Sequence, residues 1–209
     1  MANLVEDGVN GADTALAEVK PALLFLVGAP GAGKTTFYET KLQAAFPTVL
    51  KASASPLEQA RVDEERGRLL KEHRSFVYVS STVDLDLLRT ARSSEFETKV
   101  MFIATESPDL NTARVLGRVS RGGPFAALAT IPAEFEKGLR DLPAVRKTAD
   151  ELVLIDNTGE GRGHRVIARF AKGEIVKLAR SFPEWAQKPF GKEFTKWLAQ
   201  EQRVRERAR

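Results

Sequence analysis

The stretch Gly28-Ala29-Pro30-Gly31-Ala32-Gly33-Lys34-Thr35-Thr36 decides the fold of this chain. Its spacing fits G-x-x-x-x-G-K-[ST], the pattern of a phosphate-binding loop, or P-loop. The apolar run Ala22–Val27 before it is typical of a buried parallel strand, and residues 36–46 after it read as a helix. This order places consecutive N–H groups and the positive end of a helix dipole around one phosphate. The sequence therefore predicts a nucleotide-binding loop.

Each position of the loop has an expected role. We expect Lys34 to reach the β- and γ-phosphates and the Thr35 hydroxyl to bind Mg²⁺, so the predicted cofactors are ATP or GTP together with Mg²⁺. A glycine-rich turn with an incidental lysine is the alternative, and the flanking strand and helix argue against it. The residues expected to surround the phosphates are Gly28, Ala29, Pro30, Gly31, Ala32, Gly33, Lys34, Thr35 and Thr36.

Length and composition suit one sizeable α/β domain. The chain has 209 residues, no cysteine and no apolar run near the length of a membrane span, which argues against disulfides, thiolate chemistry and a membrane partner. Its first residues lack a basic segment followed by an apolar one, so we expect a cytoplasmic protein. The net charge of +4 comes largely from arginines after residue 202, which are typical of the solvated face of a terminal helix. Elsewhere the charges are mixed, and nothing indicates a nucleic-acid groove.

Apolar runs alternate with helical patterns along most of the chain. Expected strands are 22–27, 48–52, 76–80, 99–104 and 151–155, and expected helices are 36–46, 56–71, 84–93, 108–121 and 133–142. This alternation predicts an α/β fold, a P-loop NTPase three-layer sandwich with a five-stranded, mainly parallel sheet.

We expect three regions along the chain. Residues 1–20 are polar and read as a flexible arm, and residues 21–160 form the P-loop core. Residues 161–209 add a small hairpin, with strands at 165–170 and 174–178, and an amphipathic terminal helix at 190–207.

Three arginines mark the helix expected after the fourth strand. Arg114 and Arg118 are four residues apart and share one helix face, and Arg121 continues that stripe toward a glycine pair. Cations so placed can stabilise the charge that develops on a transferring phosphoryl group. A solvated helix surface is the alternative. We expect Arg114 to bind nucleotide, and Arg118 and Arg121 to act with Lys34 in catalysis.

From about Leu23 to Gly159 the sequence resembles the zeta-toxin-like P-loop kinases. The shared features are the P-loop, the segment from Ser107 to Gly123, apolar spacing in the lid helix and the phrase Leu154-Ile155-Asp156-Asn157-Thr158-Gly159. The resemblance implies phosphoryl transfer from ATP or GTP, with Asn157 near the nucleotide base. It also implies a UDP-activated amino sugar as acceptor and an antitoxin, or another cognate protein, as partner.

Several positions depart from the family pattern. Ser53 stands where the family has the aspartate that serves as general base, and serine needs a base of its own to remove a proton. The family's Glu-Thr-Thr corresponds to Val79-Ser80-Ser81, and its histidine after the glycine pair corresponds to Pro124. In the lid, arginines of the family correspond to Glu134, which would repel a triphosphate, and Lys137.

Three functions stay open at the level of sequence. In the first, the protein is a kinase whose base comes from elsewhere, with Asp84 and the nearby Asp86 as candidates, although aspartates at a helix start are commonly caps. In the second, the fold persists as a catalytically degenerate nucleotide-binding interaction module of a toxin–antitoxin or effector system. In the third, the protein is an NTPase without an acceptor.

Overall fold

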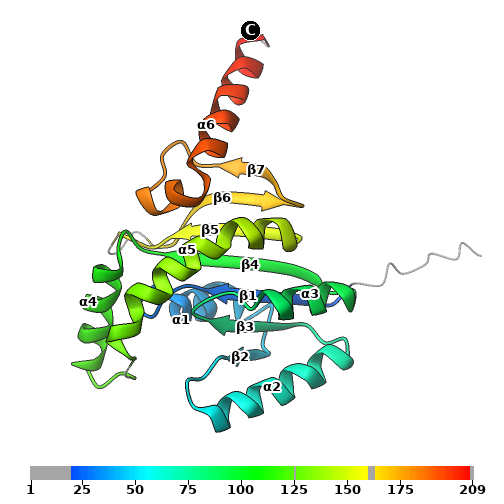
Figure 1. Cartoon of the computed structure of the whole chain (residues 1–209), viewed down its shortest axis with the longest axis vertical. Helices are drawn as coiled ribbons and strands as arrows, with labels where there is room; N and C mark the ends of the chain where they lie inside the picture. Colours follow the sequence, from blue (N-terminus) through cyan, green and yellow to red (C-terminus); the bar gives the residue numbers. More distant parts are fainter. Residues whose placement is uncertain (1–19, 125, 160–162, 208–209) are drawn as a thin grey trace, which may run out of the picture.

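A seven-stranded sheet forms the framework of the molecule, in the strand order β2-β3-β1-β4-β5-β6-β7 (Figure 1). The computed structural model describes residues 20–124, 126–159 and 163–207. The flexible arm expected at residues 1–20 therefore lies, apart from its last residue, outside the described residues. The strands are β1 Ala22–Val27, β2 Val49–Lys51, β3 Phe76–Ser80, β4 Glu97–Ala104, β5 Glu151–Asp156, β6 Arg165–Ala171 and β7 Glu174–Leu178.

The first five strands run parallel and confirm the expected α/β fold. Because parallel strands need crossover connections, helices separate them along the chain. The expected hairpin forms as β6 and β7, and it pairs antiparallel with β5, so it extends the same sheet. The sequence predicted a five-stranded sheet and an appended hairpin, whereas the structure has all seven strands in one sheet, with β2 and β7 at its two edges.

The two faces of the sheet are covered unequally. On one face, alternate β1 residues such as Leu23 and Phe25 join a large apolar core with side chains of α2, α3, α4, α5 and α6. On the other face, Leu24 and Leu26 pack with Phe37 and the segment after it in a smaller cluster. Burial on both faces explains why Ala22–Val27 is apolar at every position.

Helix positions follow the sequence prediction closely where capping signals are present. The longer helices are α2 Pro56–Lys71, α3 Leu85–Ser93, α4 Pro108–Val119, α5 Ile131–Thr148 and α6 Glu184–Arg207. Ser107 caps α4 and accepts a hydrogen bond from the Leu110 N–H (3.3 Å), with proline in the first turn.

Four helices differ in extent from the prediction. Helix α5, expected at 133–142, extends over Ile131–Thr148, and α6, expected at 190–207, begins at Glu184. The helix expected at 36–46 is a short α1, Lys34–Phe37, continued by a π-helical turn η1, Tyr38–Leu42. The helix expected to reach Arg121 ends at Val119, because Gly122 takes a left-handed φ of 79° and the chain turns there. A 3-10 turn η2, Leu128–Thr130, leads into α5.

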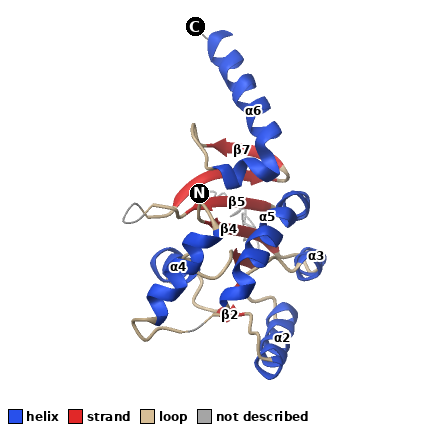
Figure 2. Ribbon diagram, turned by 60° about the vertical axis from the view of Figure 1, so that its left-hand side comes forward, coloured by secondary structure: helices blue, strands red, loops and turns tan. Residues whose placement is uncertain are grey.

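Only the first half of α6 packs against the body of the protein. Trp185, Phe190 and Phe194 are buried in the large core, whereas Val204 is 65% exposed. In both views, the C-terminal half of α6 extends away from the sheet (Figures 1 and 2). In the described part of the chain, no helix combines the length and the apolar character that a membrane crossing requires.

Candidate functional site

A cleft of about 680 Å³ opens where the parallel strands end. The P-loop after β1 forms its floor, and it is flanked by the ends of β2 and β3, by α4 and by the exit from β5. This is the edge at which open α/β sheets bind ligands. The sequence-predicted site residues that line it are Pro30, Gly31, Gly33, Lys34, Thr35, Thr36, Arg114, Arg118 and Asn157.

Close packing holds the P-loop backbone in place. Gly33 precedes α1 with a left-handed φ of 100°, and a Cβ there would lie 2.3 Å from the Asn157 Nδ2 atom. A Cβ on Gly28 would lie 2.2 Å from the carbonyl oxygen of Ile103 on β4. Within the loop, the Ala32 N–H donates to the Ala29 carbonyl (3.1 Å). Glycine is required because the loop passes against neighbouring backbone and side chains.

The Lys34 side chain folds back over the loop from which it projects. Its ammonium donates to the carbonyls of Gly28 and of Ala29, the latter at 3.2 Å. Desolvation lowers the pKa of Lys34 to about 8, Glu134 raises it in part, and Arg118 lowers it further. In the described structure this cation therefore has backbone carbonyls and one nearby carboxylate around it.

The arginines of the α4 region separate into two groups. Arg114 and Arg118 line the cleft, as their shared helix face predicts. Arg121 follows the end of α4, is exposed, and is not among the described lining residues. Gly123 folds beneath Arg118, since a Cβ there would lie 2.6 Å from the Arg118 Cγ atom. The Arg118 Nε atom is buried and has no hydrogen-bond partner in the described structure.

Arg114 ties α4 to the exit of β5. Its guanidinium donates to the carbonyls of Asn157 (2.8 Å) and Thr158 (3.3 Å). Asn157 in turn donates through Nδ2 to the Ala32 carbonyl of the P-loop (2.9 Å). These bonds join three segments that are far apart in sequence and position one wall of the cleft.

His164 is a residue near the site that sequence reasoning missed. Its ring packs edge-on against Phe37, with 4.8 Å between ring centroids, and its Nε2 atom approaches Gly33. Desolvation lowers the pKa of His164, the nearby Gly33 backbone raises it in part, and Lys41 and Arg114 lower it further. The His164 Nε2 atom is buried and has no hydrogen-bond partner in the described structure. A lone histidine between two strands carries no sequence signal that links it to a loop so distant in the chain.

The far end of the cleft is formed by the ends of β2 and β3. Lys51, Ala52, Val79, Ser80 and Ser81 line it. The Ser80 hydroxyl donates to the Thr82 carbonyl (2.7 Å), so its proton is engaged within the turn. Lys51 was not among the site residues predicted from the sequence.

Neither Asp84 nor Asp86, the candidate bases, lines the described cleft, and Ser53 does not line it either. Asp86 is exposed and pairs with Arg89 (2.7 Å). Ser53 bonds through its hydroxyl to Glu58 (2.6 Å) at the start of α2. Asp84 is the N-cap of α3: it accepts hydrogen bonds from the N–H groups of Asp86 (3.1 Å) and Leu87 (2.9 Å). Asp84 thus takes the capping position, which is the common role of an aspartate before a helix.

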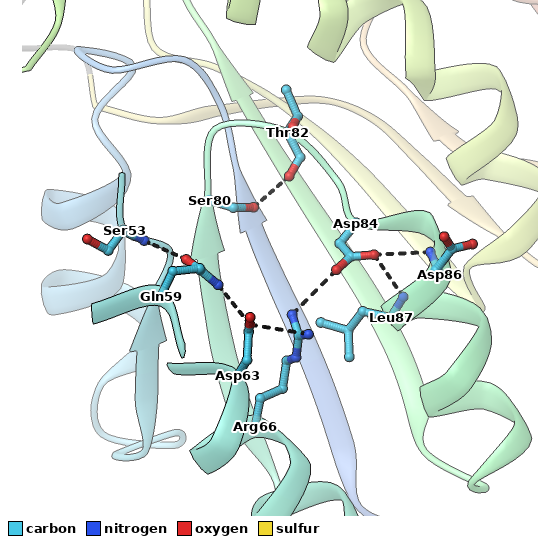
Figure 3. A network of polar contacts seen from close by, with 9 residues as sticks. All are labelled: Ser53, Gln59, Asp63, Arg66, Ser80, Thr82, Asp84, Asp86 and Leu87. Carbon is cyan, nitrogen blue, oxygen red and sulfur yellow. Dashed lines mark hydrogen bonds and ion pairs between the residues drawn. The ribbon is translucent and has the colours of Figure 1, made fainter. Parts of the chain in front are cut away.

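A polar network connects Ser53 and Asp84 across α2 (Figure 3). Gln59 accepts from the Ser53 N–H (2.8 Å) and donates to Asp63 (2.8 Å). Arg66 lies between Asp63 (3.3 Å) and Asp84 (3.4 Å) and pairs with both. The network fixes α2 against the turn that begins α3.

Helix α5 carries Glu134 and Lys137, two positions at which the sequence departs from the family that it resembles. Glu134 in its first turn has a buried carboxylate oxygen, Oε2, without a hydrogen-bond partner in the described structure. Its charge acts on Lys34, which places the carboxylate near the P-loop cation. Lys137 pairs with Asp141 at 2.5 Å along the same helix.

Fold and site together define an α/β protein with a P-loop at the end of its first strand, and comparison with solved structures finds the same fold in two other systems. AvrRxo1-ORF1 in complex with AvrRxo1-ORF2 and ATP superimposes with a TM-score of 0.61 at 14% identity, over 76% of this chain and 61% of that chain. The PezAT chromosomal toxin–antitoxin system of Streptococcus pneumoniae gives a TM-score of 0.55 at 17% identity, over 90% of this chain and 86% of that chain.

The likeness is one of fold. The chain spans about three fifths of the length of the AvrRxo1-ORF1 chains that it matches. No protein-family model matches the sequence, and no curated protein does. The resemblance read from the sequence is therefore confirmed for the architecture.

Proposed function

We propose that this protein binds a nucleoside triphosphate in the cleft and transfers its γ-phosphoryl group to a small acceptor. One observation carries the proposal: Lys34, Arg114 and Arg118 converge with the P-loop backbone on a single cleft. The unpartnered Arg118 Nε is a buried donor that an anionic ligand would satisfy. Phosphoryl transfer depends mainly on positioning and charge stabilisation, which such residues supply.

The proposed roles follow from position. The loop from Gly28 to Thr36 would surround the α- and β-phosphates, Lys34 would turn from its loop carbonyls toward the β- and γ-phosphates, and Arg118 would face the transferring group. Arg114 and Asn157 would hold the wall of the cleft.

A magnesium ion would neutralise phosphate charge in this site. Thr35 lines the cleft and offers a hydroxyl ligand. Among the described residues, no three aspartate, glutamate, histidine or cysteine side chains are grouped so that they could hold a metal ion. That donor set fits an ion held mainly by phosphates and water, as Mg²⁺ commonly is.

The relatives suggest the first nucleotide, acceptor and partner to test. AvrRxo1-ORF1 was solved with ATP and with AvrRxo1-ORF2, and PezAT is a toxin–antitoxin system. ATP is thus the leading phosphoryl donor, with GTP as the alternative, and a cognate cytoplasmic protein is the proposed partner. By family resemblance, the first acceptor is a UDP-N-acetyl amino sugar.

A second function, nucleotide binding without turnover, is favoured by the residue types that line the cleft. None of the described lining residues is acidic, so the cleft offers no evident general base for a hydroxyl acceptor. In this version the bound nucleotide would shape an interaction surface for a partner.

Titration calorimetry with Mg·ATP and Mg·GTP, followed by a γ-phosphate transfer assay, tests both functions. We expect Lys34→Ala to lose most triphosphate affinity, because it removes the cation expected to contact the β- and γ-phosphates. The control is Lys71→Ala, an exposed change at the end of α2. Equal affinity in the wild type and in Lys34→Ala would refute this site. Retained binding without transfer to any acceptor or to water would support the second function.

A further inference from the structure

The half of the cleft that faces away from the P-loop lacks acidic groups and contains one cation. Among the described lining residues, four are cationic, namely Lys34, Lys51, Arg114 and Arg118, and none is acidic. Lys34 and Arg114 are bonded to backbone carbonyls. The side chain of Lys51, at the end of β2, is exposed and forms no ion pair or hydrogen bond with the residues that the structure describes.

The carboxylates around that half of the cleft are engaged elsewhere. Glu58 accepts the Ser53 hydroxyl, and Asp63 pairs with Arg66. Asp84 caps α3 and pairs with the same arginine (Figure 3). Glu134 acts on Lys34 at the other end of the cleft and is not among the described lining residues.

This arrangement bears on which nucleophile can attack. A sugar or alcohol hydroxyl must lose its proton as it attacks phosphorus, and a positioned base normally accepts it. Serine hydroxyls, such as those of Ser80 and Ser81, do not remove a proton at neutral pH without a base of their own. A phosphate oxygen needs no base, since a phosphomonoester has a second pKa near 6 and is largely a dianion at neutral pH.

We propose that the acceptor is a phosphomonoester, whose attacking oxygen is already ionised, and that Lys51 binds this phosphate. The inference rests on the proposed phosphoryl transfer and specifies its acceptor. Lys51 would supply a point charge at the end of the cleft formed by β2 and β3, and Arg118, which also lines the cleft, would be available to either phosphate.

The reaction balances without a proton transfer. An oxygen of the acceptor phosphate forms a bond to the γ-phosphorus, while the bond from that phosphorus to the β,γ-bridging oxygen breaks. The electron pair of that bond stays on the bridging oxygen and leaves with the nucleoside diphosphate. The product is a phosphoanhydride, and the cations of the cleft offset the negative charge of the two reactants.

The experiment offers the full-length protein Mg·ATP with two acceptor panels. One panel holds nucleoside monophosphates and sugar monophosphates, and the other holds UDP-N-acetylglucosamine and unphosphorylated sugars. We expect an acid-labile product from the first panel, with the coupled phosphorus resonances of an anhydride. Within that panel, the two kinds of monophosphate distinguish the source of the phosphate.

The outcomes separate this inference from the function on which it rests. Transfer to hydroxyls alone, giving an acid-stable ester, overturns the phosphomonoester acceptor and leaves the kinase function standing. ATP binding with no transfer to either panel overturns the acceptor and favours the binding module. Absence of ATP binding by calorimetry overturns both proposals.

A Lys51 variant tests the specific contact. We expect Lys51→Met to raise the KM for the phosphomonoester at least tenfold while the affinity for ATP changes less than twofold. Lys71→Met is the matched control, another exposed lysine at the end of a secondary-structure element. Equal KM values in Lys51→Met and in Lys71→Met would overturn the assignment of Lys51, and circular dichroism confirms that both variants are folded.

Discussion

The position of the Lys34 side chain is fixed by the backbone of the P-loop that carries it. Its ammonium donates to the carbonyls of Gly28 and Ala29, in surroundings that disfavour its charge. A triphosphate would favour the charged form, because nearby anions raise the pKa of an ammonium group. Nucleotide binding and protonation of Lys34 are therefore coupled.

The pH dependence of binding follows from this coupling. The pKa of Lys34 falls from 10.5 to about 8 in the described structure, so above pH 8 the protein must take up a proton to bind phosphates with a charged lysine. We expect the affinity for Mg·ATP to fall as the pH rises through 8. Calorimetry at pH 8.5 in buffers of different ionisation enthalpy should detect the proton uptake.

Lys34→Met serves as the control for this coupling. It has no titratable group at the site, so its weaker binding should show no proton uptake at pH 8.5. Equal proton uptake by the wild type and by this variant would mean that another group is responsible.

Arg114 acts on the site through the backbone. Its bond to the Asn157 carbonyl (2.8 Å) is charge-assisted, and such a bond contributes about 1.5–3 kcal/mol, whereas its bond to the Thr158 carbonyl is long at 3.3 Å and adds little. We expect Arg114→Ala to lower the free energy of unfolding by about 2 kcal/mol and to weaken ATP binding. Urea denaturation measures the first effect and calorimetry the second. Arg89→Ala, which breaks only an exposed pair with Asp86, is the control and should change little.

At the scale of elements, two helices place glycine in different surroundings. In α2, a Cβ on Gly67 would meet nothing within 4 Å beyond the helix itself. In α5, a Cβ on Gly138 would lie 2.9 Å from the ring of Phe102, which is buried. The first glycine is a weak point of an exposed helix, and the second allows α5 to approach the sheet.

Alanine at these two positions should have opposite effects. Gly67→Ala should raise the free energy of unfolding by about 0.5–1 kcal/mol through helix propensity. Gly138→Ala should lower it by about 1–3 kcal/mol, since the added methyl overpacks the contact with β4. Thermal unfolding of both variants measures the difference, and a shift of the same sign in both would contradict the close approach of α5.

At the scale of the whole molecule, only the N-terminal half of α6 belongs to the apolar core. Phe194 is fully buried, with its ring centroid 4.9 Å from that of Phe182. Trp185 donates to the Asp156 carboxylate at the end of β5 (3.3 Å), which links α6 to the strand that leads into the site. The start of α6 therefore supports the sheet near the cleft.

Two substitutions in α6 test this division. Phe194→Ala should cost about 3–5 kcal/mol of stability, because it leaves a cavity among packed rings. Val204→Ala, at an exposed position, should change stability by less than about 0.5 kcal/mol. Chemical denaturation compares the two, and a large loss in Val204→Ala would show that the outer half of α6 is packed in solution.

Prediction from sequence succeeded where a local pattern has one physical solution. The P-loop spacing, the apolar β1 and the Ser-Pro start of α4 each gave the observed element. The predicted end of α4 was wrong, and so was the continuous helix predicted after the P-loop, where the structure has a π-helical turn. Helix ends depend on local turns and packing that periodicity does not encode. Asp84 carried both a capping and a catalytic interpretation from sequence, and the structure places it as a cap.

The sequence by itself determined the class of this protein, an α/β fold with a phosphate-binding loop, because glycine spacing and strand hydrophobicity act over a few residues. Only the tertiary structure decided which charged side chains share the cleft. It brought Lys51 to the cleft and left Arg121 outside, and it set Asn157 and His164 against the P-loop. The physical reason is that these neighbours lie far apart along the chain, and only the order and register of the strands bring them together.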